Sequence, residues 1–319
     1  MEIHSFKNAE GFPWLDNAKS NDDAYCLDNM KNWSLEIRDF ISDTDTVARL
    51  ENFVTSDEKS ILFKNCPIGN LPDTPVTNGY IENEHVMKPV KFLFGLFALL
   101  GIHPISYIGE NQGKAIRHVV PKINRENQIG SHGSLEFNYH VDNPDLLLKG
   151  EQGDRSPCLE YLALYCLRGD QAATTELVDF QDIIEHLSEE DINLALSNDF
   201  IIQRPDSFED GNPSIEDVPL VIVNNGRYFS RYDYHNVSAK SDAGTALLTK
   251  IKEIHTNTLE SKKIIFEQGD LLIFKNQETL HKRSHFIPDY NGSERWLLRL
   301  FGAENLPYQH LNNQLVLKN

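Results

Sequence analysis

The sequence lacks several features that define whole classes of protein. Among its 319 residues, the longest apolar run is FLFGLFALLGI, at residues 92–102, which contains two glycines and is too short to span a bilayer. Asp and Glu outnumber Lys and Arg by 48 to 30, giving a net charge of -18. Binding to nucleic acids or anionic membranes needs a basic surface, so neither partner is expected.

The sequence also lacks the motifs of disulfide frameworks, zinc knuckles and zinc hydrolases. The four cysteines, Cys26, Cys66, Cys158 and Cys166, form no CxxC pair, so we expect buried reduced thiols and neither a disulfide framework nor a zinc knuckle. The first twenty residues contain no basic and apolar segments of the kind found in signal peptides, so we predict a cytoplasmic protein. Without HExxH or a second cluster of acids or histidines, a zinc hydrolase is disfavoured.

The first third of the chain has helical periodicity. An apolar repeat over 47–54 follows the capping candidates Ser42 and Asp43. Residues 89–101 predict a mostly buried helix. We therefore expect residues 1–104 to be mainly helical and to pack on the rest of the protein.

Short apolar or alternating runs separated by turn residues follow. Asn225-Gly226 within VIVNNGRYF predicts a hairpin with a type I′ turn, and IIFEQGDLLIF at 264–274 predicts a second hairpin. The strands are interrupted by a helix with a Ser188/Asp191 capping box, a helix within 241–255 and a polar surface loop at 204–217. The pattern favours one α+β domain over 1–319 with a β-sandwich or jelly-roll core.

The segment LEFNYHVDNPDLLL, residues 135–148, places His140 and Asp142 two residues apart. Positions i and i+2 of a strand point to the same face, so the imidazole and the carboxylate could bind one metal ion. Such a pair is half of the 2-His-1-carboxylate group of non-haem iron(II) oxygenases. The alternative is a surface histidine followed by an aspartate that caps the turn at Asn143.

The rest of such a site must come from distant strands. EQGDLLIFKNQETLHKRSHF offers His281 and His285, which share a strand face, so periodicity leaves both open as the third ligand. SERWLLRLFG places Arg295 and Arg299 on one face of a strand. Buried arginines need anions, and bidentate arginine suits the far carboxylate of a 2-oxoglutarate cosubstrate. The alternative is that both arginines face solvent.

A family resemblance is carried by five segments that occur in order between about residues 105 and 303: ENQGKAIRHVVPK, GSHGSLEFNYHVDN, CLEYLALYCLRGDQAATTELVDF, EQGDLLIFKNQETLHKRSHF and RWLLRLFG. In this combination the sequence resembles the clavaminate-synthase-like iron(II)/2-oxoglutarate dioxygenases, which include hydroxylases of free arginine, asparagine and lysine. The resemblance implies a double-stranded β-helix (jelly-roll) core with flanking helices. It also implies Fe(II) as the metal, with 2-oxoglutarate and O2 as cosubstrates.

The resemblance also implies roles for individual residues. His140, Asp142 and His281 match the iron ligands, and His281 is preferred because Arg295 follows it by fourteen residues, the family spacing for the arginine that binds 2-oxoglutarate. The remaining matched positions are Thr174 (with Thr175 as the adjacent candidate) for the cosubstrate, Arg299 for the α-carboxylate of an amino acid, Asp233 for a cationic side chain, and Gln112 and Ser134 for the amino-acid head.

The implied reaction is hydroxylation of an unactivated C–H bond of a free basic L-amino acid, with succinate and CO2 as co-products. L-Lysine, at C3 or C4, is the first candidate, and L-arginine is the second. A carboxylate at Asp142 argues against halogenation, because related halogenases carry a small residue there. Desaturation, epimerisation, cyclisation, a carrier-bound substrate, a homo-oligomer and a non-catalytic jelly-roll module that binds a metal or ligand all stay open.

Overall fold

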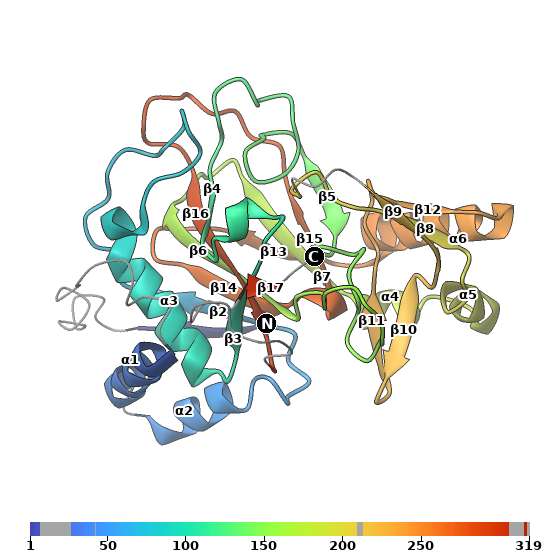
Figure 1. The fold of residues 1–319 in the computed structure, drawn as a ribbon, viewed down its shortest axis with the longest axis horizontal. Helices are drawn as coiled ribbons and strands as arrows, with labels where there is room; N and C mark the ends of the chain where they lie inside the picture. The colour runs from blue at the N-terminus through green and yellow to red at the C-terminus, as the bar shows by residue number, and fades with distance from the viewer. Residues whose placement is uncertain (7–26, 42, 209–212, 306–315, 318–319) are drawn as a thin grey trace.

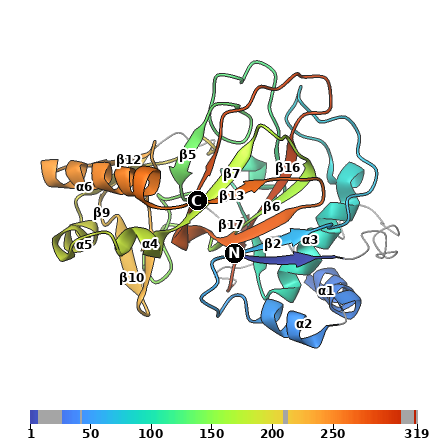
Figure 2. The same cartoon turned by 180° about the vertical axis from the view of Figure 1, so that it is seen from behind.

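The computed structural model describes residues 1–6, 27–41, 43–208, 213–305 and 316–317. Cys26 and Ser42, named above, lie outside these ranges. Two large sheets form the centre of the molecule, with helices on one side and a smaller α/β arm on the other (Figures 1 and 2). The α+β class expected from the sequence is therefore confirmed.

The larger sheet has eight strands in the order β1-β2-β14-β6-β16-β3-β17, with β4 also paired to β16. Their bounds are β1 Glu2–Ser5, β2 Ser60–Lys64, β3 His103–Tyr107, β4 Arg117–Val119, β6 Tyr161–Arg168, β14 Leu271–Lys275, β16 Trp296–Ala303 and β17 Val316–Leu317. The second sheet has the order β13-β7-β15-β5. Its strands are β5 Phe137–His140, β7 Thr174–Asp179, β13 Lys262–Ile265 and β15 Thr279–Arg283.

The two faces of the larger sheet bury different cores. On β6, Tyr161 and Tyr165 belong to the cluster that packs under the helices, whereas Leu162 and Leu164 belong to the cluster shared with the second sheet. This alternation follows from the two-residue period of a strand. Because Leu177 of β7 lies in the same cluster as Leu162, the two sheets pack face to face.

The helices at the chain's beginning cover the outer face of the larger sheet (Figure 1). They are α1 Leu27–Ile41, α2 Thr44–Glu51 and α3 Met87–Leu99. Asp43 caps α2 by accepting a hydrogen bond from Thr46 N, as expected. The expectation of a mainly helical segment was incomplete, because β1 and β2 from this part of the chain join the larger sheet.

Gly95 lets α1 and α3 approach closely. A Cβ at this position would lie 2.8 Å from Cβ of Trp33 and 3.0 Å from Cδ1 of Ile37. We expect Gly95→Ala to lower the free energy of unfolding by about 1–3 kcal/mol through overpacking, although helix propensity alone would raise it by about 1 kcal/mol. Urea denaturation decides between the two effects by sign, and a more stable variant would contradict the close packing.

The arm projects on the side opposite to α1, α2 and α3 in both views (Figures 1 and 2). It contains α4 Phe180–Ile184, α5 Glu189–Ala195, α6 Asp242–Glu253, and the strands β8 Phe200–Gln203, β9 Ser214–Val218, β10 Val221–Asn224, β11 Arg227–Ser230 and β12 Val237–Ala239. The Ser188/Asp191 capping box is present. Asn225 and Gly226 both have positive φ in the turn between β10 and β11, so that hairpin is confirmed.

Two local expectations were wrong. Residues 264–274 do not form a hairpin, because β13 pairs with β7 in the second sheet and β14 pairs with β2 and β6 in the larger one. The turn at Gly269 therefore carries the chain from one sheet to the other. The segment 204–217 is not only a loop, since β9 starts at Ser214 and pairs with β8.

The described cysteines are buried thiols, as expected from the sequence. Cys66, Cys158 and Cys166 are buried and free, and burial raises the pKa of each thiol. None of the helices described here combines the length and apolarity needed to cross a lipid bilayer.

Candidate active site

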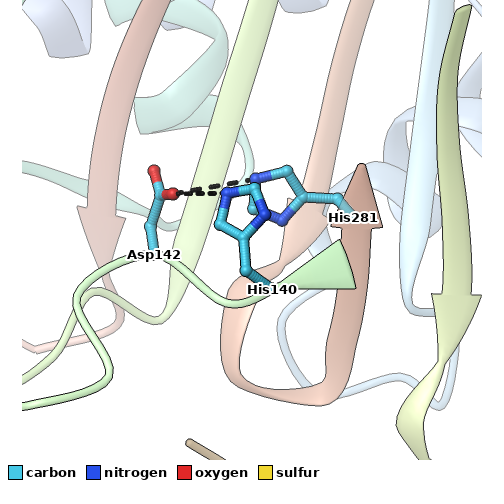
Figure 3. A group of neighbouring side chains, drawn as sticks. All are labelled: His140, Asp142 and His281. Atoms are coloured by element: carbon cyan, nitrogen blue, oxygen red, sulfur yellow. Dashed lines mark ion pairs between the residues drawn. The ribbon is translucent and has the colours of Figure 1, made fainter. Parts of the chain in front are cut away.

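A pair of neighbouring side chains, His140 and Asp142, meets the distant His281 in the interior of the protein. His140, at the end of β5, lies directly opposite His281 of β15 in an antiparallel register, and Asp142 follows β5 by two residues. One ligand atom from each residue lies within 4.8 Å of the others. Figure 3 shows both imidazoles directed toward the same carboxylate. Among the described residues, this is the one group of His, Cys, Asp or Glu with such geometry.

The distances suit a metal ion bound by all three residues. Nε2 of His140 and Nε2 of His281 lie 3.3 and 3.7 Å from Oδ1 of Asp142. Ligands at about 2.1 Å from one ion, at right angles to each other, are about 3 Å apart. Nε2 of His140 is buried without a hydrogen-bond partner in the described structure, as expected of an atom whose partner is a metal. The donor set of two imidazoles and one carboxylate fits iron(II).

The surroundings favour the tautomer that metal binding needs at His140 and the charge state that it needs at His281 and Asp142. Nδ1 of His140 donates to the carbonyl oxygen of Asn138 at 2.7 Å, which leaves Nε2 free to bind. Burial, followed by the neighbouring His140, lowers the pKa of His281 to about 3, so its imidazole is neutral at pH 7. Burial acts to raise the pKa of Asp142, but Arg299 and the imidazoles outweigh it and hold that pKa well below its usual range.

His281, and not His285, takes part in this group. His281 is 8% exposed and faces the second imidazole with ring centroids 4.1 Å apart. His285 lies beyond the end of β15 and is exposed. The two were equivalent by periodicity alone, and the end of the strand at Arg283 removes that equivalence.

The metal-binding group lines an open cavity of about 60 Å³. Its wall also includes Arg295 and Arg299, together with apolar side chains from β6 and β16. Arg299 of β16 and Arg295, one residue before the strand, line the cavity with Leu297, whereas Trp296 and Leu298 pack on the opposite face of the sheet. The alternative in which both arginines face solvent is therefore wrong.

Arg295 is a buried cation without a counter-ion. It is 4% exposed, its Nε has no hydrogen-bond partner, and no carboxylate in the described ranges forms an ion pair with it. Burial lowers the pKa of its guanidinium to about 10. A charged group in this environment is costly unless an anion binds to it, so the cavity is built to receive a carboxylate or a similar anion.

Arg299 does have partners, one of which sequence reasoning missed. Its Nη1 donates to Oδ2 of Asp142 at 3.0 Å, and its Nη2 pairs with Oε1 of Glu110. Glu110 is 2% exposed and also accepts from the side-chain amide of Asn143 at 3.2 Å. No sequence motif identifies Glu110 as a site residue, because its pairing with Arg299 of β16 depends on the fold.

Arg283 is a second missed residue of the cavity wall. It follows His281 by two positions on β15 and lines the same cavity as Arg295. Its two terminal nitrogens donate to the carbonyl oxygens of Gly130 and Leu135, at 2.9 and 2.5 Å. Burial, followed by Arg295, lowers the pKa of Arg283 to about 9. This end of the cavity therefore carries two guanidinium groups.

Three other residues that were expected to bind the cosubstrate or the substrate do not line the cavity. Thr175 lines the cavity, whereas Thr174 does not and has its backbone tied to Ser284. Gln112 is exposed, at a positive φ, and is not among the cavity residues. Ser134 is buried, but its hydroxyl donates to the carbonyl oxygen of Glu126 at 2.7 Å, away from the cavity wall.

Asp233 is buried next to the metal-binding group but has local partners. Its backbone forms an isolated bridge with His140. Its carboxylate accepts hydrogen bonds from the backbone amides of His235 and Asn236 and from the side-chain amide of Asn236, at 2.8, 3.2 and 2.7 Å. These donors are neutral, so they leave the negative charge of Asp233 uncompensated. Its role toward a cationic side chain stays a prediction.

Two characterised proteins are similar to this chain over most of its sequence. An L-asparagine oxygenase of Streptomyces coelicolor is 24% identical over 251 residues, which cover 77% of this chain and 72% of the relative. An L-lysine 3-hydroxylase of Catenulispora acidiphila is 23% identical over 265 residues, covering 80% of this chain and 70% of the relative.

Solved structures show the same fold. An asparagine oxygenase in complex with Fe(II), 2S,3S-3-hydroxyasparagine and succinate matches with a TM-score of 0.83 at 20% identity, over 100% of both chains. The non-heme iron oxygenase OrfP in complex with Fe and alpha-ketoglutaric acid matches with a TM-score of 0.78 at 18% identity, over 99% of each chain. The metal and the cosubstrate expected from the sequence are thus those of proteins with this fold.

A protein-family model establishes the family of this chain, which the two relatives at 23–24% identity do not. The model described as the taurine catabolism dioxygenase TauD, TfdA family, matches residues 139–301, just over half of the chain. The matched region begins beside His140 and ends after Arg299, so it includes the metal-binding group and both of these cavity arginines, Arg295 and Arg299. This chain belongs to the TauD/TfdA family of dioxygenases.

Proposed function

We propose that this protein is an iron(II)- and 2-oxoglutarate-dependent hydroxylase of a free L-amino acid. One observation carries the proposal: a complete His-Asp-His ligand set and a buried, unpaired guanidinium at Arg295 line one cavity. A binding site for a metal alone does not account for the arginine. A site that takes a metal and a carboxylate-bearing cosubstrate together accounts for both.

The chain's residues divide the work of such a site. His140, Asp142 and His281 hold the iron, and the second sheet, which carries both histidines, packs against the larger sheet in a double-stranded β-helix. The bound iron supplies the activation of dioxygen, using electrons from oxidative decarboxylation of 2-oxoglutarate to succinate and CO2. Arg295 anchors the far carboxylate of 2-oxoglutarate, with Thr175 on the neighbouring wall. Leu162, Leu164 and Leu297 keep the wall of the reaction space apolar and exclude water.

Arg299 and Glu110 offer opposite charges in a small second pocket, which shares Arg299 with the main cavity. A free amino acid carries a carboxylate and an ammonium on one carbon, so the pair matches its head group. We assign the α-carboxylate to Arg299, which can exchange its contact with Asp142 once that carboxylate binds the metal. The exposed position of Gln112 makes it a weaker candidate for this role than Glu110.

Within this class, we propose L-lysine as the first substrate to test and L-arginine as the second. The alignment with a lysine 3-hydroxylase and the uncompensated charge of Asp233 support a basic side chain. The equally extensive alignment with an asparagine oxygenase makes L-asparagine the neutral alternative.

Succinate release with Fe(II), ascorbate and 2-oxoglutarate, measured against each free amino acid with mass analysis of products, tests the proposal. A gain of one oxygen on one amino acid, coupled to succinate, is the expected result. A loss of two hydrogens would indicate desaturation instead. Metal-dependent succinate release that no free amino acid stimulates would contradict the free-amino-acid assignment and point to a carrier-bound substrate.

The role of Asp233 is tested by Asp233→Asn, which removes the charge but keeps an oxygen that can accept from the amides of His235 and Asn236. We expect kcat/KM for lysine to fall by about 10- to 100-fold, since a cation loses its charged partner. Turnover of a neutral amino acid should change little, which serves as the internal control. Unchanged lysine turnover would show that Asp233 only stabilises its own turn.

A further inference from the structure

Asp142 is a metal ligand that no strand holds in place. The strand β5 ends at His140, and Asp142 lies in the bend that follows, before Asn143 with its positive φ. Its backbone N–H and C=O therefore have no ladder partner. A carboxylate ligand on an unsupported backbone would lose the fixed geometry that metal binding requires.

A single side chain replaces the missing strand. Asn276 accepts a hydrogen bond at its Oδ1 from the backbone N–H of Asp142, at 2.9 Å. Its Nδ2 donates to the carbonyl oxygen of the same residue, at 3.0 Å. One amide thus satisfies both backbone groups of Asp142, in the manner of a neighbouring residue in a sheet.

Asn276 is itself held rigidly next to the second histidine. It is 0% exposed, and its backbone N–H donates to the carbonyl oxygen of Glu160 at 2.8 Å. It opens the short helix η6 Asn276–Glu278, which leads directly into the strand β15 that carries His281. The side chain therefore ties the segment with the carboxylate ligand to the segment with a histidine ligand.

We propose that Asn276 is a positioning residue of the metal site, which sets the place of the Asp142 carboxylate relative to His281. This inference rests on the proposed function of the three ligands. A carboxylate cannot replace the amide because it only accepts hydrogen bonds, and a hydroxyl cannot replace it because one oxygen does not occupy the separate positions of the amide oxygen and nitrogen. Removing the amide leaves the backbone N–H of Asp142 unpaired and leaves its carbonyl oxygen with the weak thiol donor of Cys158 alone, at 3.4 Å.

The adjacent Gln277 provides a matched control. It is also a buried amide, and it makes three hydrogen bonds to backbone groups: two from Nε2, to the carbonyl oxygens of Cys158 and Leu159, and one from Lys149 N to Oε1. None of these partners is a metal ligand. Gln277→Ala therefore reproduces the general cost of losing a buried amide without touching Asp142.

The test is the dissociation constant for Co(II), used as a spectroscopic probe in place of Fe(II), together with thermal unfolding of the metal-free proteins. We expect Asn276→Ala to weaken Co(II) binding by about 10- to 100-fold and to change the visible absorption of the bound ion. Gln277→Ala should keep the Co(II) affinity of the parent protein. It should lower the melting temperature of the metal-free protein about as much as Asn276→Ala does. Asn276→Asp, which keeps the shape and the acceptor but loses the donor, should also weaken binding, and it replaces Asn276→Ala if that variant does not fold.

The outcomes separate this inference from the proposed function. Equal weakening by Asn276→Ala and Gln277→Ala, or parental Co(II) affinity in both Asn276 variants, would overturn the positioning role while leaving the ligand set intact. Failure of the parent protein to bind Co(II) or Fe(II) would overturn both.

Discussion

Replacing His281 with alanine is expected to abolish amino-acid hydroxylation and to remove high-affinity metal binding. The site then offers two ligands in place of three, and the metal supplies several kcal/mol of the stabilisation that the reaction needs. A loss of about 4 kcal/mol corresponds to a rate lower by roughly 10³-fold. Calorimetric titration with Fe(II) under anaerobic conditions measures the binding, and succinate release measures the rate.

His285→Ala is the matched control for this variant. The two histidines are four residues apart, but His285 is exposed and lies outside the metal-binding group. We expect it to bind iron and turn over at the parental rate. If His285→Ala loses iron binding while His281→Ala retains it, the ligand set described here is wrong.

Replacing Arg295 with methionine is expected to have opposite effects on cosubstrate binding and on stability. Truncating one partner of a buried charge pair costs about 2–5 kcal/mol, so KM for 2-oxoglutarate should rise by about 30-fold to several thousand-fold. Without cosubstrate, however, Arg295 is buried and unpaired. Its replacement by an apolar side chain of similar length should leave the melting temperature unchanged or raise it.

Arg168→Met gives the opposite pattern and serves as the control. Arg168 ends β6 and donates to Thr74 and to the carbonyl oxygen of Pro72, at 2.8 and 2.6 Å. Its loss should lower the melting temperature and leave KM for 2-oxoglutarate unchanged. In addition, 2-oxoglutarate with Fe(II) should raise the melting temperature of the parent protein but not of Arg295→Met. A strongly destabilised Arg295→Met with parental KM would assign Arg295 to the fold instead of the site.

The ligand pair could be predicted from the sequence because its two residues are close together in the chain and strand geometry directs both to one face. His140 and Asp142 are two residues apart, and their side chains converge as the period of a strand predicts, although Asp142 lies just beyond the strand. The shared face of Arg295 and Arg299 followed from the same rule. Choosing His281 over His285 needed a family spacing, because the end of β15 is not encoded in the alternation of apolar residues.

The residues that the sequence did not predict are those whose roles depend on partners far along the chain. Glu110 is 189 residues from Arg299, and Asn276 is 134 residues from Asp142. The false hairpin at 264–274 has a similar cause: a turn between two apolar strands looks the same whether they pair with each other or enter different sheets. Only the long-range pairing of β13 with β7 distinguishes the two cases.

The most direct test of the account is the fate of labelled dioxygen. With Fe(II), 2-oxoglutarate and the amino acid found to stimulate turnover, a reaction under 18O2 should place one labelled atom in succinate and one in the hydroxylated amino acid, in equal amounts. Hydroxylated product whose new oxygen comes from water, or product formed without an equal amount of succinate, would contradict the assignment of this cavity to 2-oxoglutarate-coupled hydroxylation.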